Sequence, residues 1–349
     1  MGSSSASRAG KPFEFNWTMT FAAFKGDWEA RQQVHRLNRF YATKYICEHC
    51  CASYEEHNTF GDFRSNANCL SLRFTHEQYL MMSPPSPWIC VRGWTKDRNL
   101  EEPPPVNKFS DLLHVLHQGV ACVVIPALIC SGLESKHPSL TLSELDTLLQ
   151  REVYLHYKSW CRTHARKYTA TSFRFNGKRF SKLGWADFPE LSSHYKAAVV
   201  KTMMFWASDY MKDQDQEGNV PNSRLRWLCM HSFAKFQYFI DEGGPFFGDQ
   251  EVTLVTRYGH AALLFYQELA GQDRARTDGR RFLKITPKFH SLLEMLLYVK
   301  KTRRNPRFEH NYQDEDLMQH IGKIASQTHT QTMAAVTLGR YRAWVELFL

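Results

Sequence analysis

Cysteine, histidine and glutamate at the spacing of metal ligands are the feature of this chain that most directly suggests chemistry. Cys47 and Cys50 form a C-x-x-C pattern, which lets two thiolates reach one tetrahedral Zn²⁺ from a tight turn. His290 and Glu294 lie four residues apart in a stretch with helical periodicity, so their side chains share one helix face. Each pair can therefore supply two ligands of a metal site, and the cysteine pair needs two further ligands from elsewhere in the chain.

Other interpretations of these residues stay open in the sequence. His49, His57 and Cys69 lie close to the cysteine pair in the chain and could complete a local zinc site. The two cysteines could also be free thiols in a core, and His290 a buried histidine bonded to backbone. A redox role is disfavoured because no thioredoxin-like βαβ pattern surrounds the C-x-x-C pair.

A second set of residues could hold the divalent metal ions of a nuclease. Asp27 follows an aromatic, strand-like stretch, and Asp111-x-x-His114 opens an apolar stretch with helical spacing. Glu315 lies in the acidic triplet Asp314-Glu315-Asp316. Carboxylates from separate elements can share metal ions that activate the attacking oxygen and stabilise the leaving oxygen of a phosphodiester. Each of these acids could equally cap a helix, so the sequence leaves both roles open.

A basic segment precedes the acidic triplet. Residues 271–310 contain eleven Lys and Arg against four Asp and Glu, a net charge of +7 in a chain whose total is +9. Such a segment can contact phosphates, but it is equally typical of a solvated loop and helix face. The residues that we expect to contact nucleic acid are Lys300, Lys301, Arg303, Arg304 and Arg307.

The elements that must position these side chains change in character along the chain. Residues 15–24 form an aromatic, β-prone stretch that predicts a buried strand, a helix follows over 28–41, and residues 88–93 suggest another short strand. After the proline-rich linker 101–106, helical periodicity dominates. The pattern predicts an α+β chain that is mostly α-helical. Beyond the helix that Asp111 opens, helices are expected at 141–167, from a capping box, and at 189–211, 223–240, 251–270, 288–301, 314–328 and 331–348.

Bulk composition limits the class of protein. With 349 residues and 43% hydrophobic content the chain can bury a large core. Nine cysteines at irregular spacing do not resemble a secreted disulfide framework, and residues 1–10 lack the apolar run of a signal peptide. The apolar stretch 115–133 is interrupted by His117, Gln118 and Pro126. We therefore expect a buried helix in an intracellular protein, and no membrane span.

Taken in order, these residues resemble the catalytic domain shared by eukaryotic cut-and-paste transposases of the CACTA, Transib and hAT types. In that family a strand ends in a catalytic Asp, a C-x-x-C follows, and a Cys- or Asp-x-x-His lies within a long helical insertion. A His pair then completes the zinc site, and a late Glu completes the catalytic site. The residues that match in order are Asp27, Cys47, Cys50, Asp111, His114, His290 and Glu315. Residues 286–290, 305–307 and 314–316 also resemble uncharacterised mobile-element proteins of dinoflagellates.

The resemblance covers residues 15–345 and implies a fold and an activity. It implies a disordered tail at 1–12, a partial RNase H-like α/β core at 13–100, a large all-helical insertion at 101–300 and C-terminal helices at 301–349 that return to the core. Asp27, Glu315, Asp111 and His114 would serve catalysis with Mg²⁺ or Mn²⁺, and a structural Zn²⁺ would stabilise the fold. The implied partner is DNA, the implied location is the nucleus, and the implied reaction is phosphodiester cleavage and strand transfer.

Two departures from the family pattern limit this expectation. No Asp precedes Asp27, so the first catalytic carboxylate is missing, and Glu294 stands where the family has a second His. We therefore expect a truncated chain that does not cleave DNA, unless an upstream segment supplies the acid. The alternative is a non-catalytic, zinc-stabilised helical module that binds nucleic acid or protein. A third interpretation is an unrelated helical protein in which all these residues are structural.

Overall fold

The computed structural model describes residues 24–26, 38–74, 78, 108–164, 188–191, 196–218, 220–278, 280–309, 326, 336 and 338–340. These residues are mostly helical, with one two-stranded sheet among them. The mostly α-helical fold class is therefore confirmed, whereas the RNase H-like core stays a prediction. Asp27, Glu315, the predicted strand 88–93 and nearly all of the two C-terminal helices lie outside the described residues.

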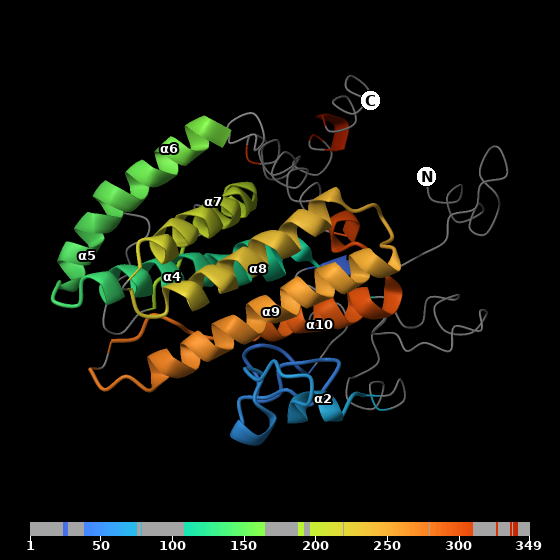
Figure 1. Cartoon of the computed structure of the whole chain (residues 1–349). Helices are drawn as coiled ribbons and strands as arrows, with labels where there is room; N and C mark the ends of the chain where they lie inside the picture. Colours follow the sequence, from blue (N-terminus) through green and yellow to red (C-terminus); the bar gives the residue numbers. More distant parts are fainter. Residues whose placement is uncertain are drawn as a thin grey trace, which may run out of the picture.

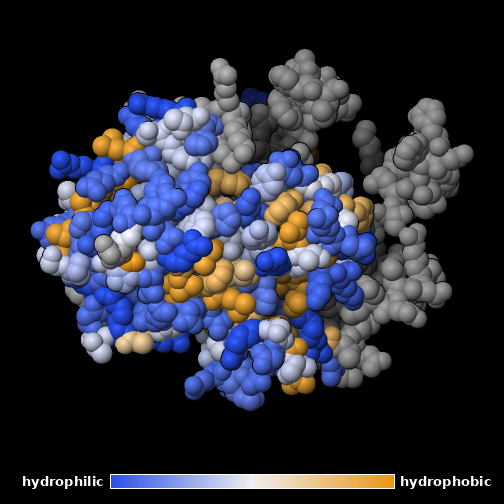
Figure 2. All heavy atoms as spheres, viewed as in Figure 1, coloured by the Kyte–Doolittle hydropathy of each residue, from blue (hydrophilic) through white to orange (hydrophobic). Residues whose placement is uncertain are grey.

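Five long helices, one of them strongly apolar, form a bundle (Figure 1). They are α4 (Ala121–Lys136), α7 (Ala197–Gln216), α8 (Ser223–Glu242), α9 (Asp249–Arg274) and α10 (Pro287–Thr302). Successive helices from α7 to α10 pack on one another, and the apolar helix contacts α7, α8 and, through the segment before it, α10. The side chains of Trp206, Phe236, Tyr266 and Phe289 are fully buried between these helices. Outward-facing positions are largely polar, as Figure 2 shows for one face, with patches of hydrophobic residues between them.

The apolar helix behaves as the sequence predicts. It runs from Leu113 to Lys136 and is long and apolar enough to cross a membrane, but 89% of its most apolar window is buried inside the bundle. Pro126 within it has no N–H, so the carbonyl of Cys122 lacks its helical partner. Leu191 donates its backbone N–H to that carbonyl at 2.9 Å. This contact holds residues 188–191 in a non-helical conformation, which explains why α7 starts at Ala197 and not at the predicted residue 189.

The first part of the apolar helix, η5 (Leu113–Val120), is a π-helix that the sequence did not predict. The wider turn brings the backbone at Gly119 close to the carbonyl of His114, where a Cβ would lie 2.6 Å from the oxygen. Lys288 of α10 donates its Nζ to the same carbonyl at 2.9 Å. The π-turn therefore needs glycine at position 119 and contributes to the contact with α10.

Gly119→Ala is expected to destabilise the protein by about 1–3 kcal/mol, because the added methyl group forces a backbone shift in a closely packed turn. The measurement is the free energy of unfolding in urea. The matched control is Gly271→Ala in α9, where a Cβ meets nothing within 4 Å and alanine favours the helix. Equal stability of the wild type and Gly119→Ala would contradict the tight turn.

Buried His117 of η5 links the apolar helix to α8. Its Nε2 donates to Gln237 Oε1 at 2.8 Å, and burial lowers the pKa of the imidazole to about 4 from 6.5. The unfolded chain therefore binds this proton at a higher pH than the folded protein does. The contribution of neutral His117 to the free energy of unfolding is therefore fully present above pH 6.5 and is lost as the pH drops towards 4.

His117→Gln should remove this acid sensitivity while keeping a side chain that can donate to Gln237. Between pH 6.5 and about pH 4, protonation of His117 is expected to lower the free energy of unfolding of the wild type by up to about 3 kcal/mol. In the variant this contribution should be absent. Urea unfolding at about pH 7 and about pH 4.5 measures the difference. The same pH dependence in both proteins would show that His117 does not titrate in the folded state as proposed.

Within the described residues, the predicted helices 141–167, 223–240, 251–270 and 288–301 are recovered with shifts of a few residues. Thr141 and Glu144 form the predicted capping box, which opens α5 (Leu142–Leu148). This helix continues through a π-turn, η6 (Leu149–Val153), into α6 (Tyr154–His164). Residues 38–44 form turns, so the described part of the predicted helix 28–41 is not helical. The reason is local, because the hydroxyl of Thr43 accepts from the backbone N–H of Phe40 and closes a turn there.

The sheet consists of two short parallel strands, β1 (Phe24–Gly26) and β2 (Lys108–Ser110). Phe24 pairs with Lys108, and Gly26 pairs with Ser110. Only the last residue of the predicted strand 15–24 falls within the described residues, and β2 was not predicted. Asp111 and then η5 follow β2 directly, so the sheet leads into the apolar helix.

Candidate metal centre

The two cysteines lie in a small lobe, residues 38–74, with little regular structure. An isolated bridge between Tyr45 and Ser53 and a hydrogen bond from Ile46 N to Ala52 O (3.0 Å) close the loop that carries them. Arg39 holds this loop from outside, donating Nη1 to the carbonyl of Cys50 at 3.2 Å. The loop thereby presents both thiols in one direction.

Phe63 docks this lobe onto the helical bundle. Its side chain is fully buried and stacks on Phe289 of α10, with ring centroids 6.2 Å apart. Its backbone N–H donates to Gln267 Oε1 at 2.8 Å, and its carbonyl accepts from His260 Nε2 at 2.5 Å. Because Phe289 directly precedes His290, this contact places the cysteine loop against the start of α10.

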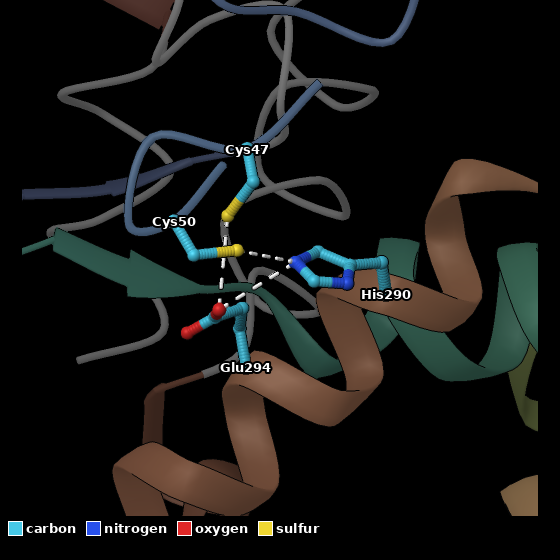
Figure 3. Close-up of side chains that lie close together, drawn as sticks. All are labelled: Cys47, Cys50, His290 and Glu294. Atoms are coloured by element: carbon cyan, nitrogen blue, oxygen red, sulfur yellow. Dashed lines mark hydrogen bonds and ion pairs between the residues drawn. The ribbon is translucent and has the colours of Figure 1, made fainter. Parts of the chain in front are cut away.

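Cys47, Cys50, His290 and Glu294 meet at this junction (Figure 3). All four are buried, and one donor atom from each lies within 4.8 Å of the others. Cys50 Sγ lies 3.2 Å from His290 Nε2, Glu294 Oε1 lies 3.5 Å from the same nitrogen, and Cys47 Sγ lies 3.7 Å from Glu294 Oε1. Tetrahedral Zn²⁺ with ordinary bond lengths has ligand-to-ligand distances of about 3.3–3.8 Å. The cluster can therefore hold a metal ion such as zinc.

The charges of the four side chains are strongly linked. Burial opposes ionisation of the Cys47 thiol, but hydrogen bonding with Cys50 and the nearby His290 hold its pKa well below the ordinary value. Burial also opposes the charge of His290, yet the negative Cys47 and Glu294 raise its pKa to about 10. The junction between the lobe and α10 thus gathers two thiols, an imidazole and a carboxyl in a buried space, where a metal ion could replace a proton.

Arg73 is the functional residue that sequence reasoning missed. It lies at the end of the cysteine lobe, where its backbone forms an isolated β-bridge with Cys50. Its two terminal guanidinium nitrogens bind the carboxylate of Glu294. Nη1 lies 3.1 Å from Oε1 and Nη2 lies 2.7 Å from Oε2. Together with His290, this ion pair lowers the pKa of the Glu294 carboxyl against the effect of burial. No local pattern marks Arg73, because its partner is 221 residues away in the chain.

Arg73→Ala is expected to weaken zinc binding about 10–100-fold, because it leaves the carboxylate without the group that orients it. The measurement is competition for zinc with a chromophoric chelator. Arg73→Lys should retain part of the affinity through one charge without the paired geometry. The control is Arg64→Ala, which removes an exposed ion pair with Asp62. Unchanged zinc affinity in Arg73→Ala would limit Arg73 to a role in packing.

The local alternatives for zinc binding lie outside this cluster. His57 contacts Asn68, and His49 lies near Glu48. Cys69 is a free thiol within hydrogen-bond reach of Cys50, at the edge of the four-residue group. Within the described part of the chain, the second ring nitrogen of His290, Nδ1, has no hydrogen-bond partner. Arg73 supports the site from outside through Glu294.

Comparison with protein-family models, curated proteins and solved structures found no match. The function must therefore be argued from the arrangement of the side chains themselves.

Of the residues expected to serve catalysis, the structure brings together Asp111 and His114. Asp111 follows β2 and is 1% exposed. Its Oδ1 accepts the backbone N–H of Leu113 at 3.1 Å, and its Oδ2 bonds directly to His114 Nδ1. Asp111 thus caps the start of the helix and orients the histidine at the same time. Asp27 and Glu315 lie outside the described residues.

The residues expected to contact nucleic acid lie at the end of α10 and in the following 3-10 turn, η8 (Pro306–Glu309). Arg303 pairs with Asp249, and Arg304 lies 3.5 Å from Glu309. Arg307 donates to the backbone carbonyl of Asp241. Lys300, Lys301, Arg303 and Arg307 are exposed. These cations gather at one end of α10.

A cavity in the described part of the chain lies apart from these residues. It measures about 500 Å³ and lies between the cysteine lobe and α9, with Asp62, Arg64, Asn68 and Arg274 in its wall. Its lining is polar and carries charges of both signs, of which Arg64 and Asp62 already pair. His57 and Cys69, two of the local alternatives for zinc binding, line it, but the four residues of the cluster and the residues expected to serve catalysis or nucleic-acid contact do not.

Proposed function

We propose that this chain is a transposase-derived, DNA-processing protein in which the junction between the cysteine lobe and α10 holds structural zinc. The observation that carries the proposal is the meeting of Cys47 and Cys50 with His290 and Glu294. The family pattern requires a C-x-x-C that pairs with a late helix across a long helical insertion. Here α4, α7, α8 and α9 lie between the two halves of the cluster in the sequence.

The proposed catalytic centre is the edge where β1 and β2 end. In a parallel pair the carboxyl ends lie at the same edge, with strands about 4.8 Å apart. Asp111 follows Ser110 directly, and in the sequence Asp27 follows Gly26, the partner of Ser110. From the sequence, the missing acid upstream of Asp27 leads us to expect no cleavage. The proposal departs from that expectation and gives Asp111 the place of the missing carboxylate, with Glu315 as the late acid. Mg²⁺ or Mn²⁺ bound by such carboxylates would activate the attacking oxygen of a phosphodiester cleavage.

His114 has a defined part in this proposal. Its Nδ1 is engaged by Asp111, which fixes the ring and its tautomer. Its Nε2 can then take up a proton from the attacking water or DNA hydroxyl, as a general base does. The basic end of α10 would bind phosphates of the same DNA, because Lys300 and Arg307 are exposed cations.

A second candidate function is a zinc-stabilised module that binds without cleaving. The observation in its favour is that the cysteine lobe has a small core of its own, made mainly of its cysteines, alanines and Ile46. A metal ion would then serve to tie this lobe to α10, as structural zinc does in small domains.

The experiment that separates the two candidates is a nicking assay on supercoiled plasmid DNA. Purified full-length protein is incubated with Mn²⁺, with Mg²⁺ or with EDTA, and binding to the same DNA is measured in parallel. Nicking that requires the divalent ion supports the enzyme. Binding without nicking in any condition supports the module, and neither binding nor nicking rejects a role in DNA processing.

A further inference from the structure

Two phenylalanine rings are exposed at the basic end of α10. Phe246, in the connection between α8 and α9, is 66% exposed, and Phe308 in η8 is 56% exposed. Most other large aromatic side chains of the helical bundle are buried or half-buried. Rings of this size in water are costly, so their exposure on a polar, basic surface indicates a site of contact with a partner.

A buried asparagine locks the two segments that carry these rings. Asn305 is 0% exposed, and its Nδ2 donates to three carbonyls at the end of α8, those of Ile240, Gly243 and Gly244, at 2.9–3.1 Å. Its backbone N–H donates to Pro245 at 2.9 Å. Phe246 also forms a bridge with Arg304. The backbone segments that carry the two rings are therefore fixed to each other, so a partner would not lose binding energy by ordering these segments.

One arginine lies beside each ring. The guanidinium of Arg304 lies 5.8 Å from the centre of the Phe246 ring, and that of Arg307 lies 5.8 Å from the centre of the Phe308 ring. Residues 300–308 carry five cations and no acid. Of the facing acids, Asp249 pairs with Arg303 and Asp241 with Lys201, and burial raises the pKa of Glu309 to about 7.

We propose that Phe246, Phe308, Arg304 and Arg307 form a platform on which unpaired bases of single-stranded DNA stack. Aromatic rings beside cations are the combination that binds single strands, because the rings stack on the bases and the cations meet the phosphates. The phosphates of duplex DNA could contact the cations, but its bases already stack on one another and would not stack on the rings. The proposal rests on the proposed function for its choice of DNA, and it names exposed bases as the feature that this chain recognises.

The test measures binding of the full-length protein to a fluorescent single-stranded oligonucleotide and to its duplex by anisotropy. Phe246→Ala and Phe308→Ala should each weaken single-strand binding about tenfold, and the double variant more, with duplex binding changed less than about twofold. Phe308→Trp should retain or increase single-strand affinity. The matched control is Leu155→Ala, which removes an equally exposed apolar side chain (58%) from α6. Thermal unfolding confirms that each variant is folded.

The outcomes distinguish this platform from the proposed function. Single-strand binding that is unchanged in the double variant, while the wild type binds duplex DNA, overturns the platform and leaves the proposed function standing. Absence of all DNA binding by the wild type overturns both. The same loss with single-stranded RNA of equal sequence supports the platform, because stacking on an aromatic ring is shared by both polymers.

Discussion

Purified protein is expected to contain one equivalent of zinc, and Cys47→Ser and His290→Ala should each abolish it. The two residues are far apart in the sequence, yet their donor atoms belong to one cluster in the fold. Loss of either removes a ligand and leaves the remaining buried charges without the metal ion. Metal analysis of the dialysed wild type and both variants measures the effect.

The effect on stability should be large. Structural zinc in small domains contributes apparent binding free energies of about 10–16 kcal/mol, and this binding favours only the folded state. A chelator should therefore lower the thermal unfolding temperature of the wild type by many degrees and leave that of the two variants unchanged. The cysteine lobe, which has little core of its own, should detach first and become sensitive to protease.

Cys161→Ser is the matched control, because Cys161 is a free, half-buried cysteine outside the cluster. It should keep its zinc. Zinc that is lost with Cys47→Ser but kept with His290→Ala would place the site within the lobe, with Cys69 as the nearest further ligand. No zinc in the wild type would mean that Arg73 and His290 neutralise the buried charges and that the cluster is purely structural.

Local signals in the sequence predicted the helices and the candidate ligands well. The capping box at Thr141 and the proline at position 287 mark helix starts through chemistry within four residues, so the predicted and observed starts differ by at most one residue. Likewise, C-x-x-C and the spacing of His290 and Glu294 are local patterns. That these pairs meet was expected only from the resemblance to transposases.

What the sequence did not predict depends on contacts between distant residues. Arg73 acts through a carboxylate on another element, and Asn305 through carbonyls at the end of α8. The late start of α7 follows from Pro126, whose missing N–H draws in Leu191. The strand β2 has three residues, too few for an alternating pattern. The roles of such residues can be recognised only when the positions of their distant partners in the fold are known.

Asp111→Asn is expected to reduce divalent-metal-dependent DNA nicking at least about a hundredfold, while the protein stays folded. The substitution removes the negative charge that the proposed centre at the strand ends requires. Asparagine still offers an oxygen to the backbone N–H of Leu113, so the cap should remain and stability should change by less than about 1 kcal/mol. Its amide nitrogen can face His114 Nδ1 only as a donor, which also forces the imidazole into the other tautomer.

A large loss of nicking with little change in stability would indicate a catalytic role of Asp111 and not a structural one. If Asp111 only caps the helix, Asp111→Asn should change neither the nicking rate nor the unfolding free energy by much, because asparagine keeps the cap. The measurements are the initial nicking rate with Mn²⁺, the affinity for the same DNA and the unfolding free energy, each beside Asp213→Asn, an exposed acid on α7. His114→Ala should slow nicking less than Asp111→Asn does, because it removes the proton acceptor and keeps the carboxylate. If Asp111→Asn nicks DNA at the wild-type rate, the strand ends are not the catalytic centre, and Asp111 is a helix cap.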